Sequence, residues 1–322
     1  MSAPALLIDN LSVEFRTRSG VVKAVENVTI SVGKGETVAI VGESGSGKSV
    51  TAYTAMRILD AAGRVTGGRI MLGAVDLLTL RESELAELRG REIAMIFQNP
   101  RSALNPIRPV GRQIADVLIR HANVPRALAA QRAVELLQAV GITDPARRAK
   151  AYPFEMSGGM CQRVMIAIAL AARPSVLIAD EPTTGLDVTT QAVIMELIAD
   201  LAVDIRMATV FITHDLALAG QHADRIVVMH AGHVVETAPT AALFAWPRHP
   251  YTAQLIAATA ESAASLQELA SIPGSLPDLQ RADLPPCRFS QRCHLKTTAC
   301  DQTLPSLSPN STHAVACWNP LQ

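Results

Sequence analysis

The chain has 322 residues, 49% of them hydrophobic and 18% charged, so it is long enough for one large domain or two modest ones with a buried core. Lysine plus arginine equals aspartate plus glutamate at 29 each, which gives no reason to expect a polyanion such as DNA as the main partner. The longest apolar stretch, 164–172, is far shorter than the roughly 18 residues of a membrane span. The N-terminus also lacks a signal-peptide pattern, so we expect a cytoplasmic chain that meets a membrane only through an embedded partner.

The N-terminal part predicts strands and a glycine-rich loop. Residues 6–15 mix apolar and polar side chains as an edge sheet would, and residues 38–41 form a short apolar run typical of a buried strand. A helix is expected to begin near Lys48, directly after the loop. The loop matches the complete pattern G-x-x-x-x-G-K-[ST] and consists of Gly42, Glu43, Ser44, Gly45, Ser46, Gly47, Lys48 and Ser49.

This order of strand, loop and helix suits a nucleotide triphosphate. Backbone N–H groups can meet several negative charges without filling the pocket, because glycine lets the backbone come close. The positive end of the following helix dipole adds to this attraction. We expect Lys48 to reach the β- and γ-phosphates and the Ser49 hydroxyl to ligate Mg²⁺. A glycine-rich turn without a ligand is the alternative, and the strand and helix on either side make it the weaker one.

The middle of the chain is predicted to alternate between helices and strands. Residues 88–172 are expected to be mostly helical, with apolar residues at helical spacing over 110–121 and 127–140 and a short strand over 93–97. Further buried strands are predicted over 176–179, 209–212 and 226–229. Such alternation predicts an α/β fold with a parallel sheet covered on both faces.

Two acidic residues directly follow the predicted strand 176–179. A carboxylate at the end of a central strand lies beside the phosphate loop in this class of fold. Asp180 is therefore expected to hold Mg²⁺, directly or through water, and Glu181 to polarise the attacking water as general base. The alternative is that both acids cap the helix after Pro182.

The composition changes after about residue 270, where prolines interrupt regular structure. The chain has five cysteines, and four of them lie in this tail, whereas Cys161 is expected to be a small buried or half-buried thiol. Four thiolates suit a tetrahedral zinc or a [4Fe–4S] cluster, although the spacing lacks the C-x2-C pair of a zinc ribbon. Four unrelated thiols are the remaining interpretation. The tail cysteines are Cys287, Cys293, Cys300 and Cys317.

Together these motifs resemble the ATP-binding subunits of ABC transporters, from residue 6 to about 250. The resemblance implies a P-loop NTPase fold of ABC type with an antiparallel β edge and a helical subdomain over about 88–172. It implies a nucleotide-binding domain over 1–250 and a cysteine-rich C-terminal extension over 251–322. Gln98, after the strand 93–97, resembles the Q-loop glutamine, which senses the γ-phosphate and Mg²⁺ and couples to the membrane subunit.

Three further positions take their roles from the same resemblance. Asp187 resembles the D-loop aspartate at the dimer interface, and His214 resembles the switch histidine that contacts the γ-phosphate. Phe15 is expected either to stack on adenine or to belong to the core.

Residues 156–160 resemble the family's signature motif, which completes the ATP site of the partner subunit. The small hydroxyl and two glycines at a helix start suit an anion, and a simple helix cap is the alternative. Met156 and Met160 depart from the common leucine and glutamine, but the core of the motif is intact. That core consists of Ser157, Gly158 and Gly159.

The segments 97–106, 157–164 and 249–252 resemble the dipeptide, oligopeptide and nickel importers within this family. That resemblance favours [4Fe–4S] in the tail, with zinc second. It implies a heterodimer with a second ATPase subunit, two transmembrane permease subunits and an extracytoplasmic solute-binding protein. The chain would lie peripherally on the cytoplasmic face of the inner membrane.

The implied function is ATP hydrolysis, with Mg²⁺, that powers import of a dipeptide, a longer peptide or a related solute. A soluble ABC ATPase acting on nucleic acid or ribosomes would need a basic surface or a long insertion, and the balanced charge argues against it. A P-loop kinase would have no use for Ser157, Gly158 and Gly159 facing a partner's ATP.

Overall fold

The structure is a computed structural model that describes residues 3–259, 272–281, 283–307 and 311–322. Its contacts divide the chain into two compact units. The first unit contains residues 1–32, 37–78 and 211–322, and the second contains residues 33–36 and 79–210. The predicted boundary near residue 250 stays a prediction, and the contacts group the tail with the N-terminal strands.

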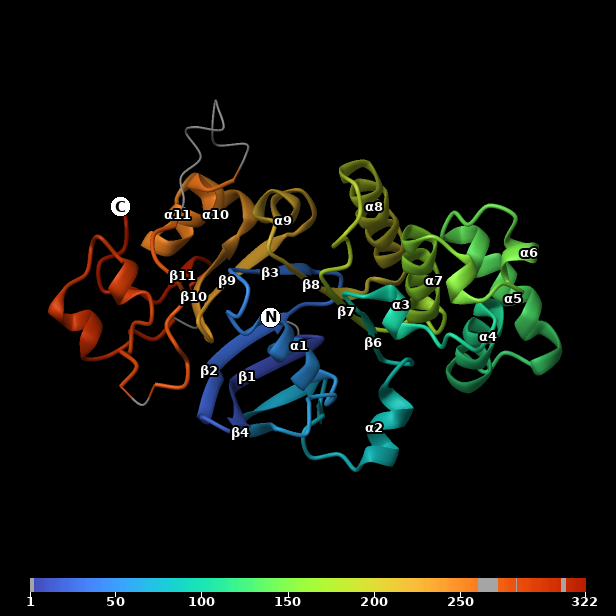
Figure 1. The fold of residues 1–322 in the computed structure, drawn as a ribbon, viewed down its shortest axis with the longest axis horizontal. Coiled ribbons are helices and arrows are strands. Elements are labelled where there is room, and N and C mark those ends of the chain that lie inside the picture. Colours follow the sequence, from blue (N-terminus) through green and yellow to red (C-terminus); the bar gives the residue numbers. More distant parts are fainter. Residues whose placement is uncertain (1–2, 260–271, 282, 308–310) are drawn as a thin grey trace. The chain divides into compact units, whose positions relative to one another are not determined.

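The first unit begins with an antiparallel four-stranded sheet in the order β2-β1-β4-β5, visible in blue and cyan in Figure 1. Its long strands alternate buried and exposed side chains, because one face packs on the core. The predicted edge sheet over 6–15 is thereby confirmed. The strands are β1 (Leu6–Thr17), β2 (Gly20–Val32), β4 (Gly63–Leu72) and β5 (Val75–Asp76).

The same unit contains a second group of strands in the order β11-β10-β9-β3. The strand β3 (Thr37–Val41) is fully apolar after its first residue and pairs in parallel with β9 (Arg225–His230). Antiparallel pairing then adds β10 (His233–Pro239) and the two-residue strand β11 (Ala314–Val315), which comes from the C-terminal tail. The tail thus supplies a strand, β11, to the same sheet as β3, and β3 leads into the phosphate loop.

The helices of the first unit are short. α1 begins at Lys48, as predicted, and the remaining helices precede or follow strands of the same unit. In the part of the tail that the structure describes, the 3₁₀ turns η4 and η5 accompany β11. These elements are α1 (Lys48–Ala55), α9 (Leu216–His222), α10 (Thr240–Ala245), α11 (Pro250–Ala257), η4 (Ser290–Arg292) and η5 (Thr298–Asp301).

The second unit is mainly helical and has its own apolar core, in which Ile114, Leu137, Val164 and Leu177 are fully buried. The predicted helices over 110–121 and 127–140 are present within one residue. Its helices are α2 (Glu82–Leu88), α3 (Pro100–Ala103), α4 (Val110–His121), α5 (Arg126–Ala139), α6 (Pro145–Arg148), η1 (Pro153–Glu155), α7 (Gly158–Leu170) and α8 (Val188–Ile205).

Two parallel strands support the second unit, β6 (Ile93–Ile96) and β7 (Val176–Asp180). All their residues are buried, as expected for a parallel sheet covered on both faces. The boundary between the units falls within β8 (Ala208–Thr213). The predicted strands over 93–97, 176–179, 209–212 and 226–229 are therefore confirmed.

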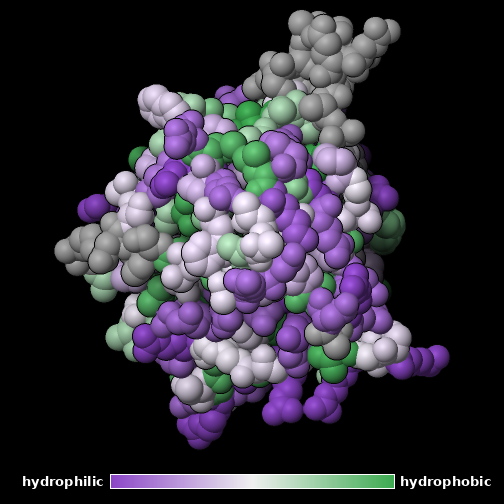
Figure 2. Space-filling view, turned by 90° about the vertical axis from the view of Figure 1, so that its left-hand side faces the viewer, coloured by the Kyte–Doolittle hydropathy of each residue, from purple (hydrophilic) through white to green (hydrophobic). Residues whose placement is uncertain are grey.

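The surface that carries the C-terminal tail is mainly hydrophilic. On the face drawn in Figure 2, apart from the grey atoms, hydrophobic residues form only small groups among polar ones. In the described part of the chain, none of the helices has both the length and the apolar composition to cross a bilayer. The apolar stretch 164–172 lies in and just after helix α7.

Candidate ATP site

The loop between β3 and α1 has a backbone that only glycine accepts at two places. Gly42 has φ +150°, and a Cβ there would lie 2.1 Å from the Met229 carbonyl oxygen. Gly47 has φ +100°, and a Cβ there would lie 2.7 Å from the Ala24 carbonyl oxygen. The glycines of the motif therefore let the loop pack between β2, β9 and the start of α1. The predicted close approach of the loop backbone to a triphosphate stays a prediction.

Lys48 lies at the start of α1 with its side chain almost buried inside the loop. Its Nζ donates to the carbonyl oxygens of Gly42 at 2.7 Å and Glu43 at 2.9 Å. Ser46 is fully buried, and its carbonyl accepts the Gly232 N–H at 2.9 Å. The ammonium group thus lies within the ring of the loop, where a phosphate ligand would approach the α1 N-terminus.

The second unit brings two predicted catalytic residues together. Gln98 Nε2, just after β6, donates to Glu181 Oε2 at 2.7 Å, and the Thr184 hydroxyl donates to the same oxygen at 2.8 Å. Asp180, the last residue of β7, is fully buried. Glu181 itself has φ +45°, a left-handed conformation that non-glycine residues seldom adopt. Such backbone strain at a strand end is typical of functional sites.

The predicted signature and D-loop residues begin helices in this unit. The Ser157 hydroxyl caps α7 by accepting the Met160 N–H at 3.3 Å. Asp187 caps α8 and accepts both the N–H and the hydroxyl of Thr190, at 3.0 and 2.7 Å. A Cβ at Gly158 would have no neighbour within 4 Å, so this turn is open to a ligand. The helix cap after Pro182 is thus made by Asp187, and Asp180 and Glu181 do not supply it.

Two predicted nucleotide contacts lie in the first unit. His214 is exposed directly after β8. Phe15 lies on β1, where it is partly exposed, and it covers Gly63 so closely that a Cβ there would lie 2.9 Å from the ring. The roles of His214 at a phosphate and of Phe15 at an adenine stay predictions.

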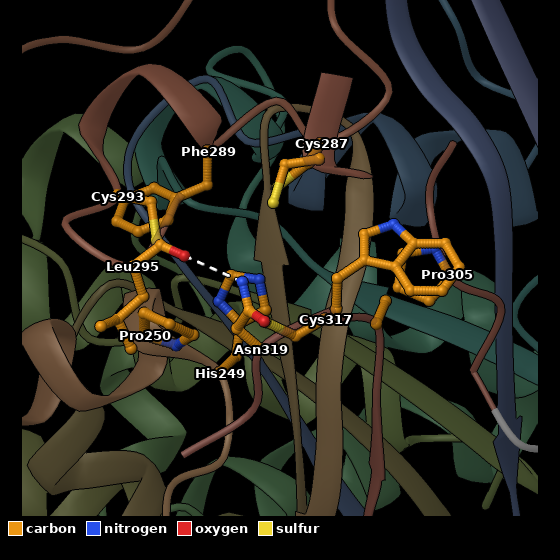
Figure 3. A pocket seen from close by; sticks show the side chains of 12 residues that line it. His249, Pro250, Cys287, Phe289, Cys293, Leu295, Pro305, Cys317 and Asn319 are labelled. Atoms are coloured by element: carbon orange, nitrogen blue, oxygen red, sulfur yellow. Dashed lines mark hydrogen bonds between the residues drawn. The ribbon is translucent and has the colours of Figure 1, made fainter. Parts of the chain in front are cut away.

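The four tail cysteines lie around one pocket. Figure 3 shows three of them, Cys287, Cys293 and Cys317, beside His249 and Phe289, and Cys300 also lines it. Burial raises the pKa of Cys287 to about 11 and also raises the pKa of Cys293 and Cys317. In the described residues no group of three or more His, Cys, Asp or Glu side chains is arranged to hold a metal ion. Cys161 lies within α7, in the second unit, and is fully buried, which is one of the two predicted outcomes.

The sequence did not reveal how the tail contacts the phosphate loop. Arg292, in η4, donates to both carboxylate oxygens of Glu43, at 2.7 and 2.9 Å. The Tyr251 hydroxyl, in α11, accepts the Glu43 N–H at 3.0 Å. Arg292 holds the pKa of Glu43 below its ordinary value, against burial, which acts in the opposite direction. The sequence shows Arg292 directly before Cys293, but this position does not identify Glu43 as its partner.

A second arginine of the tail pairs with β2. Arg288 donates to Glu26 and to the carbonyl of Ala231. A hydrogen bond from His233 lowers the pKa of Glu26 to about 2, with Arg288 adding to the effect and burial opposing it. Both arginines of the segment between Cys287 and Cys293 therefore join the tail to the strands around the phosphate loop.

Comparison with known proteins agrees with this geometry. Residues 25–184 match the family described as "ABC transporter", and residues 235–300 match the "Oligopeptide/dipeptide transporter, C-terminal region". A dimeric ATP-binding cassette, solved in a post-hydrolysis state with ADP and phosphate, has a TM-score of 0.65 and 29% identity over 73% of this chain and 98% of its own. CbiO1 from Clostridium perfringens, part of an ABC transporter complex, has a TM-score of 0.63 and 26% identity over 76% and 92% of the two chains.

Curated relatives match nearly the whole chain. A putative peptide import ATP-binding protein of Brucella abortus is 46% identical over 98% of this chain and 95% of its own. The dipeptide transport ATP-binding protein DppD of Escherichia coli is 47% identical over 94% and 92% of the two chains. The oligopeptide transport ATP-binding protein OppD of Bacillus subtilis is 45% identical over 97% and 88%.

The chain therefore belongs to the ATP-binding subunits of ABC transporters, and its activity is ATP hydrolysis coupled to transport. Within that class it carries the C-terminal region of the oligopeptide/dipeptide transporters. The predicted fold, a P-loop NTPase of ABC type, is confirmed.

Proposed function

We propose that this chain powers the import of dipeptides or oligopeptides across the cytoplasmic membrane. The names of three relatives that match at least 94% of the chain support this substrate class. The single observation that carries the catalytic part is the strained Glu181 at the end of β7, held at 2.7 Å by Gln98.

The residues of the first unit bind the nucleotide phosphates. The loop N–H groups and the α1 N-terminus attract the negative charge, and Lys48 exchanges its loop carbonyls for phosphate oxygens. The Ser49 hydroxyl and the Asp180 carboxylate are the residues that would hold Mg²⁺, and Gln98 would approach the same ion. Mg²⁺, when bound, neutralises the charge that develops on the phosphoryl oxygens.

Glu181 accepts a proton from the attacking water. Gln98 and Thr184 donate to Oε2, so they orient the carboxylate for that proton transfer. His214 assists at the γ-phosphate, and Phe15 stacks on the base. The Ser157, Gly158 and Gly159 turn, with Asp187, serves the ATP of the partner subunit.

The test of the catalytic proposal is the Glu181→Gln variant in the full chain. ATP hydrolysis should fall by about 10²–10⁴-fold, the usual contribution of a general base. The variant should also retain ATP and pair more tightly with its partner subunit. Glu196→Gln, an exposed residue of α8, is the matched control and should hydrolyse ATP like the unchanged protein. A Glu181→Gln variant with undiminished hydrolysis would contradict the proposal.

The proposed partners are a second, different ATPase subunit, two transmembrane permease subunits and an extracytoplasmic solute-binding protein. In this assembly the chain lies peripherally on the cytoplasmic face of the inner membrane. Purification of the tagged chain from membranes, followed by native mass spectrometry, should give one copy of it beside a second ATPase. Two copies of this chain in each assembly would exclude the heterodimer. Uptake of a labelled peptide that stops in the Glu181→Gln strain would support the substrate class.

The four tail cysteines are proposed to hold a [4Fe–4S] cluster with a structural role, and zinc is the second choice. Their presence around one pocket supports a shared ligand, because four thiolates match the donor set of either site. A bound metal would also offset the burial that raises the pKa of Cys287, Cys293 and Cys317.

Anaerobically purified protein should show a broad absorbance near about 400 nm, typical of such a cluster. Cys293→Ser should lose the band, and Cys161→Ser, in the core of the second unit, should keep it. A colourless sample that contains zinc would reject the cluster.

A further inference from the structure

Glu43 places a carboxylate in a loop that is proposed to bind anions. Its carboxylate belongs to the residue directly after Gly42, whose carbonyl accepts from the Lys48 ammonium. An uncompensated negative charge at this place would weaken the binding of a triphosphate, because like charges repel each other at short range. The structure compensates this charge with a residue from the far end of the chain.

The guanidinium of Arg292 is held by contacts with Glu43 and with two residues of the tail, Pro273 and Phe289. Its Nη1 and Nη2 donate to Glu43 at 2.7 and 2.9 Å, in the two-pronged geometry that gives the strongest arginine–carboxylate pairs. Its Nε donates to the Pro273 carbonyl at 2.7 Å, and its guanidinium lies 5.7 Å from the centre of the Phe289 ring. The side chain is only 5% exposed, against 29% for Glu43. Water therefore screens this pair less than it would screen a surface pair.

The loop is held at three different groups of Glu43. The Glu43 N–H donates to Tyr251, the carbonyl accepts from Lys48, and the carboxylate accepts from Arg292. Tyr251 is fully buried, so this contact is also fixed by packing. In addition, a Cβ at Gly45 would lie 3.5 Å from Leu276 of the tail. The tail thus contacts the loop at both Glu43 and Gly45.

We propose that Arg292 is a positioning residue for nucleotide binding: it neutralises Glu43 and holds the phosphate loop in its binding shape. This inference rests on the proposed binding of ATP phosphates at the loop. It assigns the C-terminal extension a direct effect on ATP affinity, whichever metal the extension holds. Arg292 touches Glu43 and not the nucleotide, so it acts through the loop.

The test is a charge cycle in the full chain, measured with Mg²⁺ and a fluorescent ATP analogue. Arg292→Gln should weaken nucleotide binding about tenfold, the effect of about 1.4 kcal/mol, with kcat changed less than about twofold. Arg292→Lys keeps the charge and should recover most of the affinity. Glu43→Gln combined with Arg292→Gln removes both charges and should return the Kd to within about threefold of the original. A merely structural role would leave the double variant as weak as Arg292→Gln.

Three controls separate the outcomes. Arg281→Gln, an exposed arginine of the same tail that pairs with Asp283, should bind the analogue normally. Lys48→Ala tests the proposed function itself and should lose binding. If Lys48→Ala loses binding while Arg292→Gln keeps the original Kd, the inference fails and the proposed function stands. Should Arg292→Gln not fold, the double variant still decides: an unchanged Kd supports the inference, and a tenfold loss overturns it.

Discussion

Two glutamates of this chain, Glu43 in the first unit and Glu181 in the second, each follow the end of a buried parallel strand, yet they are held in opposite ways. Glu43 is paired with a buried guanidinium from the C-terminal tail. Glu181 accepts from the amide of Gln98 and the hydroxyl of Thr184, which are both neutral. A cation stabilises a carboxylate as an anion and so makes it a poorer proton acceptor, whereas neutral donors orient it without a full charge. The comparison teaches that a carboxylate paired with a guanidinium suits the neutralised role proposed for Glu43, whereas the contacts with Gln98 and Thr184 suit the base proposed at Glu181.

The largest effect is expected where the phosphate loop is changed in its backbone. Gly42→Ala should abolish nucleotide binding and lower the free energy of unfolding by about 3 kcal/mol or more, because the new Cβ would lie 2.1 Å from the Met229 carbonyl at a φ of +150°. Gly20→Ala is the matched control, with φ +143° and no neighbour within 4 Å. It should cost about 1 kcal/mol and leave binding intact. Denaturant unfolding measures the free energy of unfolding, and nucleotide titration measures the affinity. Equal losses in Gly42→Ala and Gly20→Ala would show that the backbone conformation, and not the contact with Met229, causes the effect.

Variants of Gln98 test whether the charge of the hydrogen-bond donor to Glu181 affects its proposed activity as a base. Gln98→Ala removes an orienting donor and should lower kcat about tenfold. Gln98→Lys replaces it with a cation, as at Glu43, and should lower kcat about 100-fold because the paired carboxylate accepts a proton less readily. Steady-state hydrolysis by the assembled transporter measures both. Equal losses in the two variants would mean that the charge of the donor is unimportant.

The last effect concerns acid stability around Glu43, where His230 and His249 are buried with Tyr251 and Phe289. Burial lowers the pKa of His230 to about 4 and of His249 to about 3. The unfolded chain binds these protons at higher pH than the folded one does. Stability contributed by the neutral imidazoles is thus complete above about pH 6.5 and is lost as the pH falls toward 4.

The free energy of unfolding should therefore fall less steeply with decreasing pH in His230→Phe. Between about pH 6.5 and 4 the slope should be smaller by about 1.4 kcal/mol per pH unit. Tyr251→Phe, which removes a hydroxyl from the same cluster but no proton in this range, should lower stability without changing that slope. Urea unfolding at a series of pH values provides the measurement. An unchanged slope in His230→Phe would contradict a buried neutral imidazole.

Local features of this protein were predictable from the sequence, and long-range ones were not. The loop, β3 and the start of α1 were predicted because a strand, glycines and Lys48 follow each other within one short segment. The pair of Glu43 and Arg292 joins residues 249 positions apart, and a single sequence carries no signal for such a partner. The φ of +45° at Glu181 was also beyond prediction, since residues other than glycine rarely adopt it. Gln98 was predicted through the resemblance to the family's Q-loop glutamine and its position after a strand.

The surroundings of Lys48 have a consequence for how fast nucleotide can be captured. In the folded chain its ammonium group donates to two carbonyl oxygens, at 2.7 and 2.9 Å, in place of water molecules. When phosphate oxygens arrive, the ammonium replaces one set of oxygen ligands with another, so little further dehydration stands in the way. The desolvation of this cation is completed when the chain folds. Capture of nucleotide then depends on the movement of a few loop carbonyls.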